Sequence, residues 1–210
     1  KWQKTVKKIR KKQKNFHPKH KNLKDYASFY YLISKAPDFF KETPIVTSNG
    51  TAHVITLQTY KLNKNQRLFT NVGCASMGYG LPAAIGACIA NNKKPVICVE
   101  GDGSIMMNLQ ELQTIVGYKL PIKIIVLNNN GYLSIRQTQQ TYFSDNMFGV
   151  GPNDGVSFPD FVKLAKAMDI DSCRVSTLEE WLSPNTQQLL NSDSFVLIEI
   201  MIDPTQQFSP

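Results

Sequence analysis

The chain has 210 residues and a formal net charge of +8, but its first 24 residues contain 11 of the 24 lysines and arginines and no acidic residue. Residues 25–210 contain 13 basic and 16 acidic residues, so they lack the broad basic surface of nucleic-acid-binding proteins, and we expect no nucleic-acid partner. No run approaches the ~20 apolar residues of a membrane helix, and the four cysteines form no CxxC pair, which favours a cytoplasmic protein without disulfides or membrane contact.

Residues 1–14 predict an amphipathic helix, because Trp2, Val6 and Ile9 recur at helical spacing among lysines and arginines. Helices of this kind can bind membrane surfaces or nucleic acid, but we favour a connecting helix whose apolar stripe packs on a neighbouring domain. A polar linker follows, up to residue 24. Its His17 and His20 have metal-compatible spacing, yet no other ligand lies nearby in the sequence, and we expect no metal there.

From residue 26 onward, short apolar strands alternate with helical segments. This alternation predicts an α/β fold, an open, doubly wound, mostly parallel sheet of about six strands with helices on both faces. A loop rich in Gly, Asn and Asp at residues 144–157 is long enough to be a lid or a binding loop. The predicted strands cover residues 45–47, 67–69, 96–99, 122–127, 173–175 and 195–201, and the predicted helices cover about 26–35, 51–59, part of 71–87, 108–116, 133–142, 158–168 and 176–190.

Several of these helices have candidate capping residues. Ser48 or Asn49 could cap the helix after the first strand, and Asn108 could cap the helix before residue 122. Ser176 and Glu179 have the spacing of a capping box, which predicts one helix from there to about residue 190.

The segment from residue 96 to residue 132 contains most of the candidate chemistry. It predicts a buried strand, a Gly-rich turn, a helix, a second buried strand and a polar turn, which together form one βαβ unit. Because such crossovers are right-handed, both turns should lie at the carboxyl edge of the sheet, where ligands bind in open α/β folds.

The two turns offer a sparse set of oxygen ligands. Asp102 lies between Gly101 and Gly103, and the second turn offers the side chains of residues 128–130 and a backbone carbonyl near Gly131. One carboxylate with amide and carbonyl oxygens suits Mg²⁺, which fills its remaining positions with water and phosphate oxygens. The glycines let a phosphate approach the backbone, and Ser104 adds a hydroxyl near a helix start. The alternative is an ordinary Rossmann-like turn with an Asp at a helix start.

The sequence Gly-Asp-Gly-Ser, followed after 27 positions by a pair of asparagines, resembles the metal-diphosphate motif of thiamine-diphosphate enzymes. The resemblance covers about residues 25–202 and is closest to the acetolactate synthase and pyruvate decarboxylase group. It implies thiamine diphosphate and Mg²⁺ as cofactors. The residues that it implies as metal ligands are Asp102, Asn129 and the backbone carbonyl of Gly131.

The same resemblance assigns the cofactor site. The diphosphate would contact Gly103 and Ser104 on one side and Asn49, Gly50 and Thr51 on the other. Ala75, Ser76 and Met77 would meet the cofactor rings, the carbonyl of Ala75 accepting a hydrogen bond from the aminopyrimidine and Met77 holding the two rings in a V. Tyr132 and Leu133 would line the cofactor site behind the metal. These residues are, in full, Asn49, Gly50, Thr51, Ala75, Ser76, Met77, Gly101, Asp102, Gly103, Ser104, Asn129, Gly131, Tyr132 and Leu133.

No catalytic acid or base can be named on this chain. Family members activate the aminopyrimidine with a glutamate from a separate pyrimidine-binding domain, usually that of a partner subunit. We therefore expect a 2-oxo acid substrate such as pyruvate, a homodimer or tetramer, and no activity from this chain alone. Residues 1–24 resemble the helix and linker that leave the family's preceding domain, so we expect a fragment whose cofactor domain is residues 25–210.

One departure bears on the substrate. Acetolactate synthases typically carry Met and Trp at the positions of Ser134 and Thr138, both facing the substrate. The sequence is therefore also compatible with a sibling carboligase in sugar or surface-polysaccharide synthesis. A third interpretation is a cofactor-binding module without catalysis, although the complete ligand set argues against it.

Overall fold

The structure is a computed structural model that describes residues 2–12, 20, 25–144 and 146–208. The predicted N-terminal helix is present, whereas His17 and most of the predicted linker lie outside the described residues. His20 is buried, with its ring centroid 4.6 Å from that of Tyr30. The elements are α1 (Trp2–Lys12), α2 (Phe29–Lys35), α3 (Pro37–Phe40), β1 (Ile45–Thr47), α4 (Gly50–Thr59), β2 (Leu68–Phe69), α5 (Gly80–Ala90), β3 (Val96–Gly101), α6 (Asp102–Ile105), the 3₁₀ turn η2 (Met106–Asn108), α7 (Glu111–Tyr118), β4 (Ile122–Asn128), α8 (Leu133–Tyr142), the 3₁₀ turn η3 (Pro152–Asp154), α9 (Phe161–Ala167), β5 (Asp171–Val175), α10 (Leu178–Leu182), α11 (Pro184–Asn191) and β6 (Val196–Met201).

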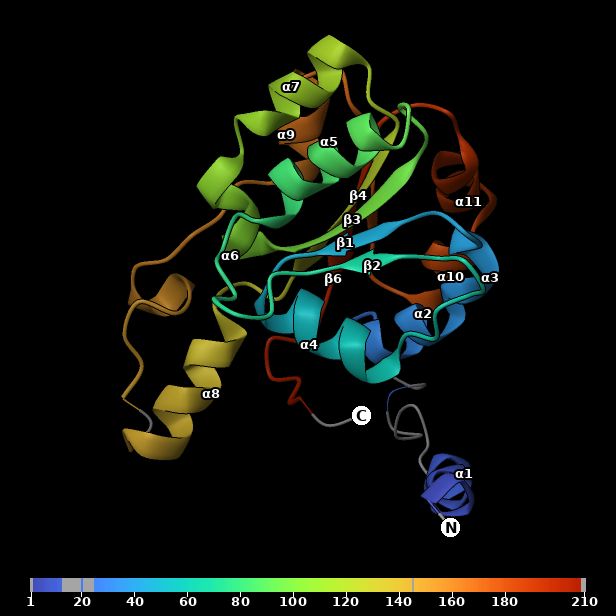
Figure 1. The fold of residues 1–210 in the computed structure, drawn as a ribbon. Coiled ribbons are helices and arrows are strands. Elements are labelled where there is room, and N and C mark those ends of the chain that lie inside the picture. Colours follow the sequence, from blue (N-terminus) through green and yellow to red (C-terminus); the bar gives the residue numbers. More distant parts are fainter. Residues whose placement is uncertain (1, 13–19, 21–24, 145, 209–210) are drawn as a thin grey trace.

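The strands form one six-stranded sheet in the order β2-β1-β3-β4-β6-β5, and every neighbouring pair is parallel. The predicted doubly wound α/β fold is therefore confirmed. The chain first moves outward from β1 to β2 and then crosses back to β3 on the other side of β1 (Figure 1). The carboxyl ends of β1 and β3 thus lie side by side at the point where the direction of winding reverses, which is where open α/β sheets bind ligands.

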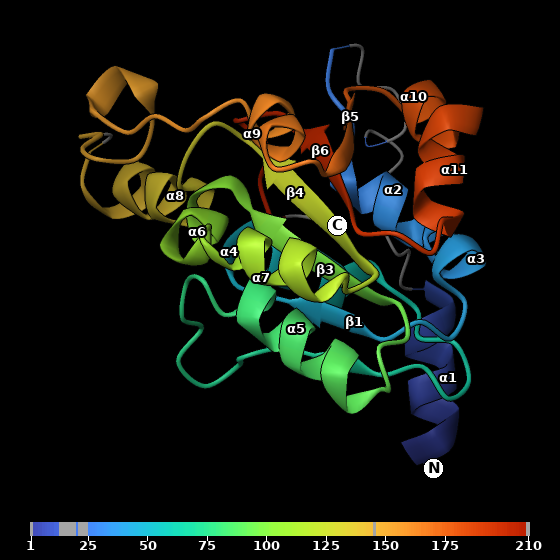
Figure 2. The same cartoon turned by 90° about the horizontal axis from the view of Figure 1, so that it is seen from above.

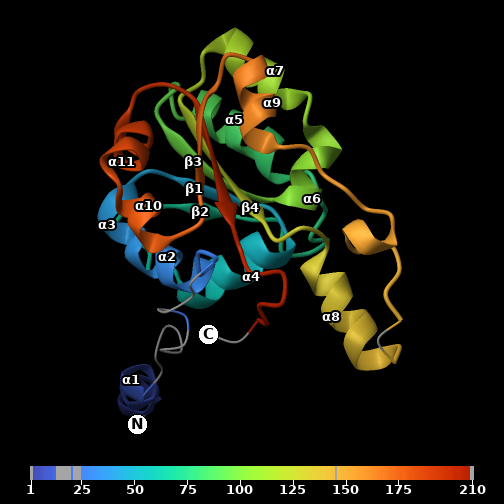
Figure 3. The ribbon, with the colours of Figure 1, turned by 180° about the vertical axis from the view of Figure 1, so that it is seen from behind.

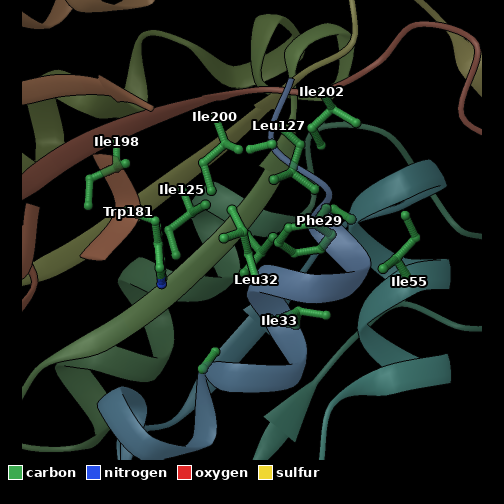
Figure 4. Close-up of a cluster of buried hydrophobic side chains, with 14 of the residues drawn as sticks. Phe29, Leu32, Ile33, Ile55, Ile125, Leu127, Trp181, Ile198, Ile200 and Ile202 are labelled. Atoms are coloured by element: carbon green, nitrogen blue, oxygen red, sulfur yellow. The ribbon is translucent and has the colours of Figure 1, made fainter. Parts of the chain in front are cut away.

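Helices cover both faces of the sheet. One face packs against α2, α4 and α10, and its core brings Phe29, Leu32 and Trp181 onto Ile125 of the central strand (Figure 4). The other face packs against α5, α7 and α9, which lie in front of the strands in Figure 2 and on the far side of the sheet from α2 and α4 in Figure 3. Because both faces are covered, β3, β4 and β6 are buried along almost their whole length, as their mostly apolar sequences predict.

Three predicted caps are wrong. Asn108 begins no helix, since α6 starts at Asp102 directly after β3 and Asn108 lies inside the helical path, where its Nδ2 donates to the Gly78 carbonyl at 2.8 Å. The capping box is one residue later than predicted, with Thr177 accepting from the Glu180 amide. Neither Ser48 nor Asn49 caps α4 through its side chain.

The predicted helix over residues 176–190 is divided into α10 and α11. Pro184 begins the second helix, where its missing N–H has no helical partner to lose, and Ser183 caps it by accepting from the Thr186 amide. Among the described helices, none is long and apolar enough to cross a membrane.

Candidate functional site

Three chain segments meet at the carboxyl ends of β1 and β3. Ser48, just after β1, and Ser104, in the first turn of α6, share a hydrogen bond of 2.7 Å between their hydroxyl oxygens. The Ser104 oxygen also accepts from the amide of Gly78, in the loop before α5, at 2.9 Å. The turn after β1 is bent by Gly50, whose φ of +53° lies in the left-handed region that favours glycine. These contacts join segments that are up to 56 residues apart in the sequence.

Asp102 connects the two turns of the βαβ unit. Its Oδ1 accepts from the amide of Gly103 at 2.7 Å, and its Oδ2 accepts from the amides of Asn129 and Gly131 at 3.1 and 3.0 Å. The side chain is almost fully buried, and this burial raises the pKa of Asp102 to about 6, against the opposing effect of the backbone N–H groups of Gly131, Gly103, Asn129 and Asn130. The hydrogen bonds between the Asp102 carboxylate and the turn at residues 129–131 therefore fix the orientation of both.

Asn129 has a buried amide oxygen without a hydrogen-bond partner among the described residues. Its Nδ2 donates to the Thr51 hydroxyl at 3.0 Å. A buried, unpaired amide oxygen is costly and calls for an explanation, and a bound cation supplies one. Within the described part of the chain, no group of three or more His, Cys, Asp and Glu side chains could hold a metal. The donor set thus fits a cation that takes most of its ligands from phosphate and water, as Mg²⁺ does.

A cavity of about 80 Å³ opens above these residues. It lies at the carboxyl edge of the sheet, between the ends of β1, β3 and β4 and the first turn of α8. Twelve of the fourteen predicted cofactor-binding residues line it, and Ser134 and Ile135 of α8 complete the lining. The lining residues are Asn49, Gly50, Thr51, Met77, Gly101, Asp102, Gly103, Ser104, Asn129, Gly131, Tyr132, Leu133, Ser134 and Ile135.

Glycine is required at two positions of this lining. A Cβ on Gly103 would lie 2.2 Å from the ring of Tyr132, which in turn packs edge-to-face on Phe158. Gly131 has a φ of +143°, and a Cβ there would lie 2.0 Å from the carbonyl oxygen of Val150. The backbone consequently approaches the cavity and its neighbours more closely than any other residue type would allow.

The two remaining predicted residues do not line the cavity. Ala75 and Ser76 lie in the exposed loop between β2 and α5, where Ala75 has a φ of +48°. Met77, at the end of this loop, does line the cavity but keeps 38% of its surface exposed. In this chain alone, the surface of the loop that would meet the cofactor rings is therefore open.

Glu100 is a feature of the site that the motif did not predict. It is fully buried on β3, and its Oε1 accepts from the amide of Leu81 at the start of α5 at 3.2 Å. Burial raises the pKa of Glu100 to about 7, although hydroxyls of Ser104 and Ser48 oppose the shift. A Cβ on Gly80 would collide with this carboxylate, so glycine lets the helix approach it. A charged residue inside an apolar strand was the available sequence signal.

Comparisons with known proteins agree with this geometry. The sequence model of the thiamine pyrophosphate enzyme C-terminal TPP-binding domain matches residues 48–200. The acetolactate synthase isozyme 1 large subunit of Escherichia coli is 32% identical over 190 residues, which are 89% of this chain and 33% of that protein. The acetolactate synthase large subunit of Buchnera aphidicola is 36% identical over 173 residues, 81% of this chain and 30% of that protein.

A solved structure shares the fold. The thiamine diphosphate-dependent 4-hydroxybenzoylformate decarboxylase of Rhodococcus jostii superposes with a TM-score of 0.77 at 23% identity, over 91% of this chain and 35% of that one. The present chain spans about a third of the length of the curated relatives that it matches.

Proposed function

Because this chain belongs to the family of C-terminal TPP-binding domains of thiamine pyrophosphate enzymes, we propose that it holds the diphosphate and Mg²⁺ end of thiamine diphosphate in a 2-oxo acid decarboxylase or carboligase resembling acetolactate synthase. The observation that carries the proposal is that Asp102 and Asn129 line the same cavity, that Asp102 accepts from the Asn129 backbone amide, and that the side-chain oxygen of Asn129 is unpaired. Asp102, Asn129 and the Gly131 carbonyl would hold the metal.

The lining of the cavity supports a role for each remaining segment. The Ser104 hydroxyl and the backbone of residues 101–104, at the start of α6, would contact one side of the diphosphate, and residues 49–51 the other. Tyr132 and Leu133 line the cavity beside the turn and would limit the access of water to a bound metal. When bound, thiamine diphosphate supplies the electron sink needed to break the bond between the carboxylate and the carbonyl carbon of a 2-oxo acid.

The openness of the site supports a contribution from a second domain. A cavity of about 80 Å³ is far smaller than the ~300–1,000 Å³ of typical small-molecule pockets, and the Met77 loop above it is exposed. We propose that the pyrimidine-binding domain of a partner subunit closes the site, within a homodimer or tetramer. That domain would supply the catalytic acid–base group, for which this chain offers no assigned residue.

The substrate proposal is a 2-oxo acid such as pyruvate, based on the similarity to acetolactate synthase large subunits. A specific observation favours a second candidate, a sibling carboligase with a more polar second substrate. Ser134 lines the cavity, and Thr138, one turn later on α8, is exposed with its hydroxyl donating to the Ser134 carbonyl at 3.0 Å. Small polar side chains there leave space and hydrogen-bonding groups for a polyhydroxylated acceptor, for example in sugar or polysaccharide synthesis.

Calorimetric titration of the chain with thiamine diphosphate tests the cofactor site. Binding should require Mg²⁺ and disappear in EDTA. A single carboxylate cannot hold the metal without phosphate oxygens, and the site cannot hold the diphosphate without the metal. Asp102→Ala should lose binding while its circular dichroism stays unchanged. Asp171→Ala, which removes an exposed carboxylate from the edge strand β5, is the matched control. Equal affinity with and without metal, or normal binding by Asp102→Ala, would refute the assignment.

A further inference from the structure

A chain of polar side chains connects the proposed metal turn to the far edge of the sheet. Asn128, the last residue of β4, donates from Nδ2 to Oε1 of Glu199 on β6 at 2.7 Å. The other oxygen of Glu199 accepts from Nε of Arg174 on β5 at 2.8 Å. Arg174 also pairs with Asp160 at 2.9 Å, and Asp160 caps α9 by accepting from the Lys163 amide. Three adjacent strands and one helix are thereby linked to one turn.

The side chain of Asn128 is held at both ends. Its Oδ1 accepts from the amide of Asn130 at 3.0 Å, which folds the turn back on itself, while Nδ2 is fixed by Glu199. The backbone carbonyl of Asn128 accepts from the Ile202 amide at 2.8 Å, so the turn leaves β4 in register with the end of β6. The direction in which residues 129–131 leave the sheet therefore depends on Glu199.

The burial of Glu199 shows that this contact is a strong constraint. Its side chain is 1% exposed, whereas its partner Arg174 keeps 43% of its side-chain surface exposed. Both carboxylate oxygens have charge-assisted or amide donors, so the geometry of Glu199 is fixed from two sides. A glutamine would keep the shape but could offer its single oxygen to Asn128 or to Arg174, and not to both.

We propose that Glu199 is a positioning residue for the cofactor site, acting through Asn128 to hold the 129–131 turn in the shape that presents Asn129 and Gly131 to the metal. This inference rests on the proposed function, because the role of the turn as a metal site is itself a proposal. Glu199 contacts neither metal nor cofactor. Its contribution resembles that of the outer hydrogen-bond partners of metal ligands, whose loss typically weakens metal binding ~10–100-fold.

The test compares Glu199→Gln and Glu199→Ala with a control on the same pair of strands. Lys123, at the opposite end of β4, is also buried, and its ammonium donates to the Ser192 and Ser194 carbonyls. Lys123→Met therefore disturbs a buried polar contact of this sheet without touching the turn. For each full-chain variant, the Mg²⁺ concentration that half-saturates thiamine diphosphate binding is measured together with the thermal midpoint of the cofactor-free protein.

A second readout needs no cofactor. The amides of Asn129 and Gly131 donate to Asp102 in the folded chain, and their hydrogen-exchange rates report on the shape of the turn. Glu199→Gln should raise these two rates and the half-saturating Mg²⁺ concentration about tenfold each, while the amide of Ile125 in the middle of β4 stays protected. Lys123→Met should lower the thermal midpoint and leave both quantities within about twofold of wild type.

The outcomes separate the inference from the proposed function. If Asp102→Ala loses binding but both Glu199 variants bind Mg²⁺ and cofactor like wild type, the positioning role is wrong and the metal site stands. If Lys123→Met weakens binding as much as the Glu199 variants do, the effect is a general loss of stability and the positioning role is also wrong. If Asp102→Ala binds normally, the metal site itself is wrong, and the inference falls with it.

Discussion

Replacing Gly131 with alanine perturbs the structure and the proposed metal turn at once. The φ of +143° is costly for any residue with a Cβ, by about 1–3 kcal/mol. The new methyl group would also lie 2.0 Å from the backbone oxygen of Val150, which accepts the Tyr132 amide, and displacing packed backbone costs another ~1–3 kcal/mol. A loss of roughly 3 kcal/mol in the free energy of unfolding corresponds to a midpoint lower by ~6–12 °C for a domain of this size.

The same substitution should weaken cofactor binding. The amide of Gly131 donates to Asp102 at 3.0 Å, so a displaced turn loses both this contact and the position of the Gly131 carbonyl. Thermal unfolding followed by circular dichroism, with and without thiamine diphosphate and Mg²⁺, measures both effects.

Gly117→Ala is the matched control for Gly131→Ala. Gly117 lies in α7, has no left-handed φ, and has open space around its Cβ position. There the substitution should stabilise the fold by about 0.5–1 kcal/mol. If Gly131→Ala unfolded at the wild-type temperature and bound the cofactor normally, the strain, the contact with Val150 and the role of the turn would all be refuted.

Three further results are expected. Burial raises the pKa of Asp102 to about 6, above its value in the unfolded chain. The protonated Asp102 side chain therefore contributes fully to the stability of the cofactor-free fold below about pH 4, and this contribution is lost as the pH rises through 6. Mg²⁺-dependent binding should conversely weaken below pH 6, because protons compete for the carboxylate; calorimetry from pH 5 to 8 checks this, and a flat profile would contradict it. Gly103→Ala should displace Tyr132 and so lower both the melting temperature and the cofactor affinity. Gly86→Ala, with open space around its Cβ, should lower neither. If Gly103→Ala had as little effect as Gly86→Ala, Tyr132 would be free to move. The 210-residue chain alone should release no CO₂ from pyruvate at an enzymatic rate, because a positioned acid–base group typically contributes ~10²–10⁴-fold; turnover equal to that of a form carrying a pyrimidine-binding domain would mean that such a group lies on this chain.

The amino-acid sequence was sufficient for the architecture. Buried parallel strands are mostly apolar, as in residues 96–99 and, apart from Lys123, residues 122–127, and this signal does not depend on distant contacts. The alternation of strands and helices, together with the right-handed crossover rule, is enough to place the two turns at one edge of the sheet. The same pattern placed the glycines and the carboxylate of residues 101–104 at that edge, where they line the cavity, whereas their roles toward a cofactor follow from the family resemblance and stay a prediction.

Helix beginnings were less predictable because a cap depends on which backbone amides the fold leaves free. Asn108 has the right side chain for a cap, but α6 begins at Asp102 and places Asn108 within the helical path, where it bonds to Gly78 instead. Thr177 and Glu180 form the capping box that the neighbouring pair Ser176 and Glu179 resembles equally well in sequence.

Only the tertiary structure showed which buried side chains hydrogen-bond to the segments that form the site. Glu100 and Glu199 look like isolated charges in apolar strands, and the sequence gives no sign of their partners, because Leu81 is 19 residues from Glu100 and Asn128 is 71 residues from Glu199. Buried charges are tolerated only where donors meet them, and those donors come from other strands and helices. Local patterns therefore determined the strands, the edge and the motif, whereas the contacts that hold the motif in shape are long-range and exist only once the sheet has assembled.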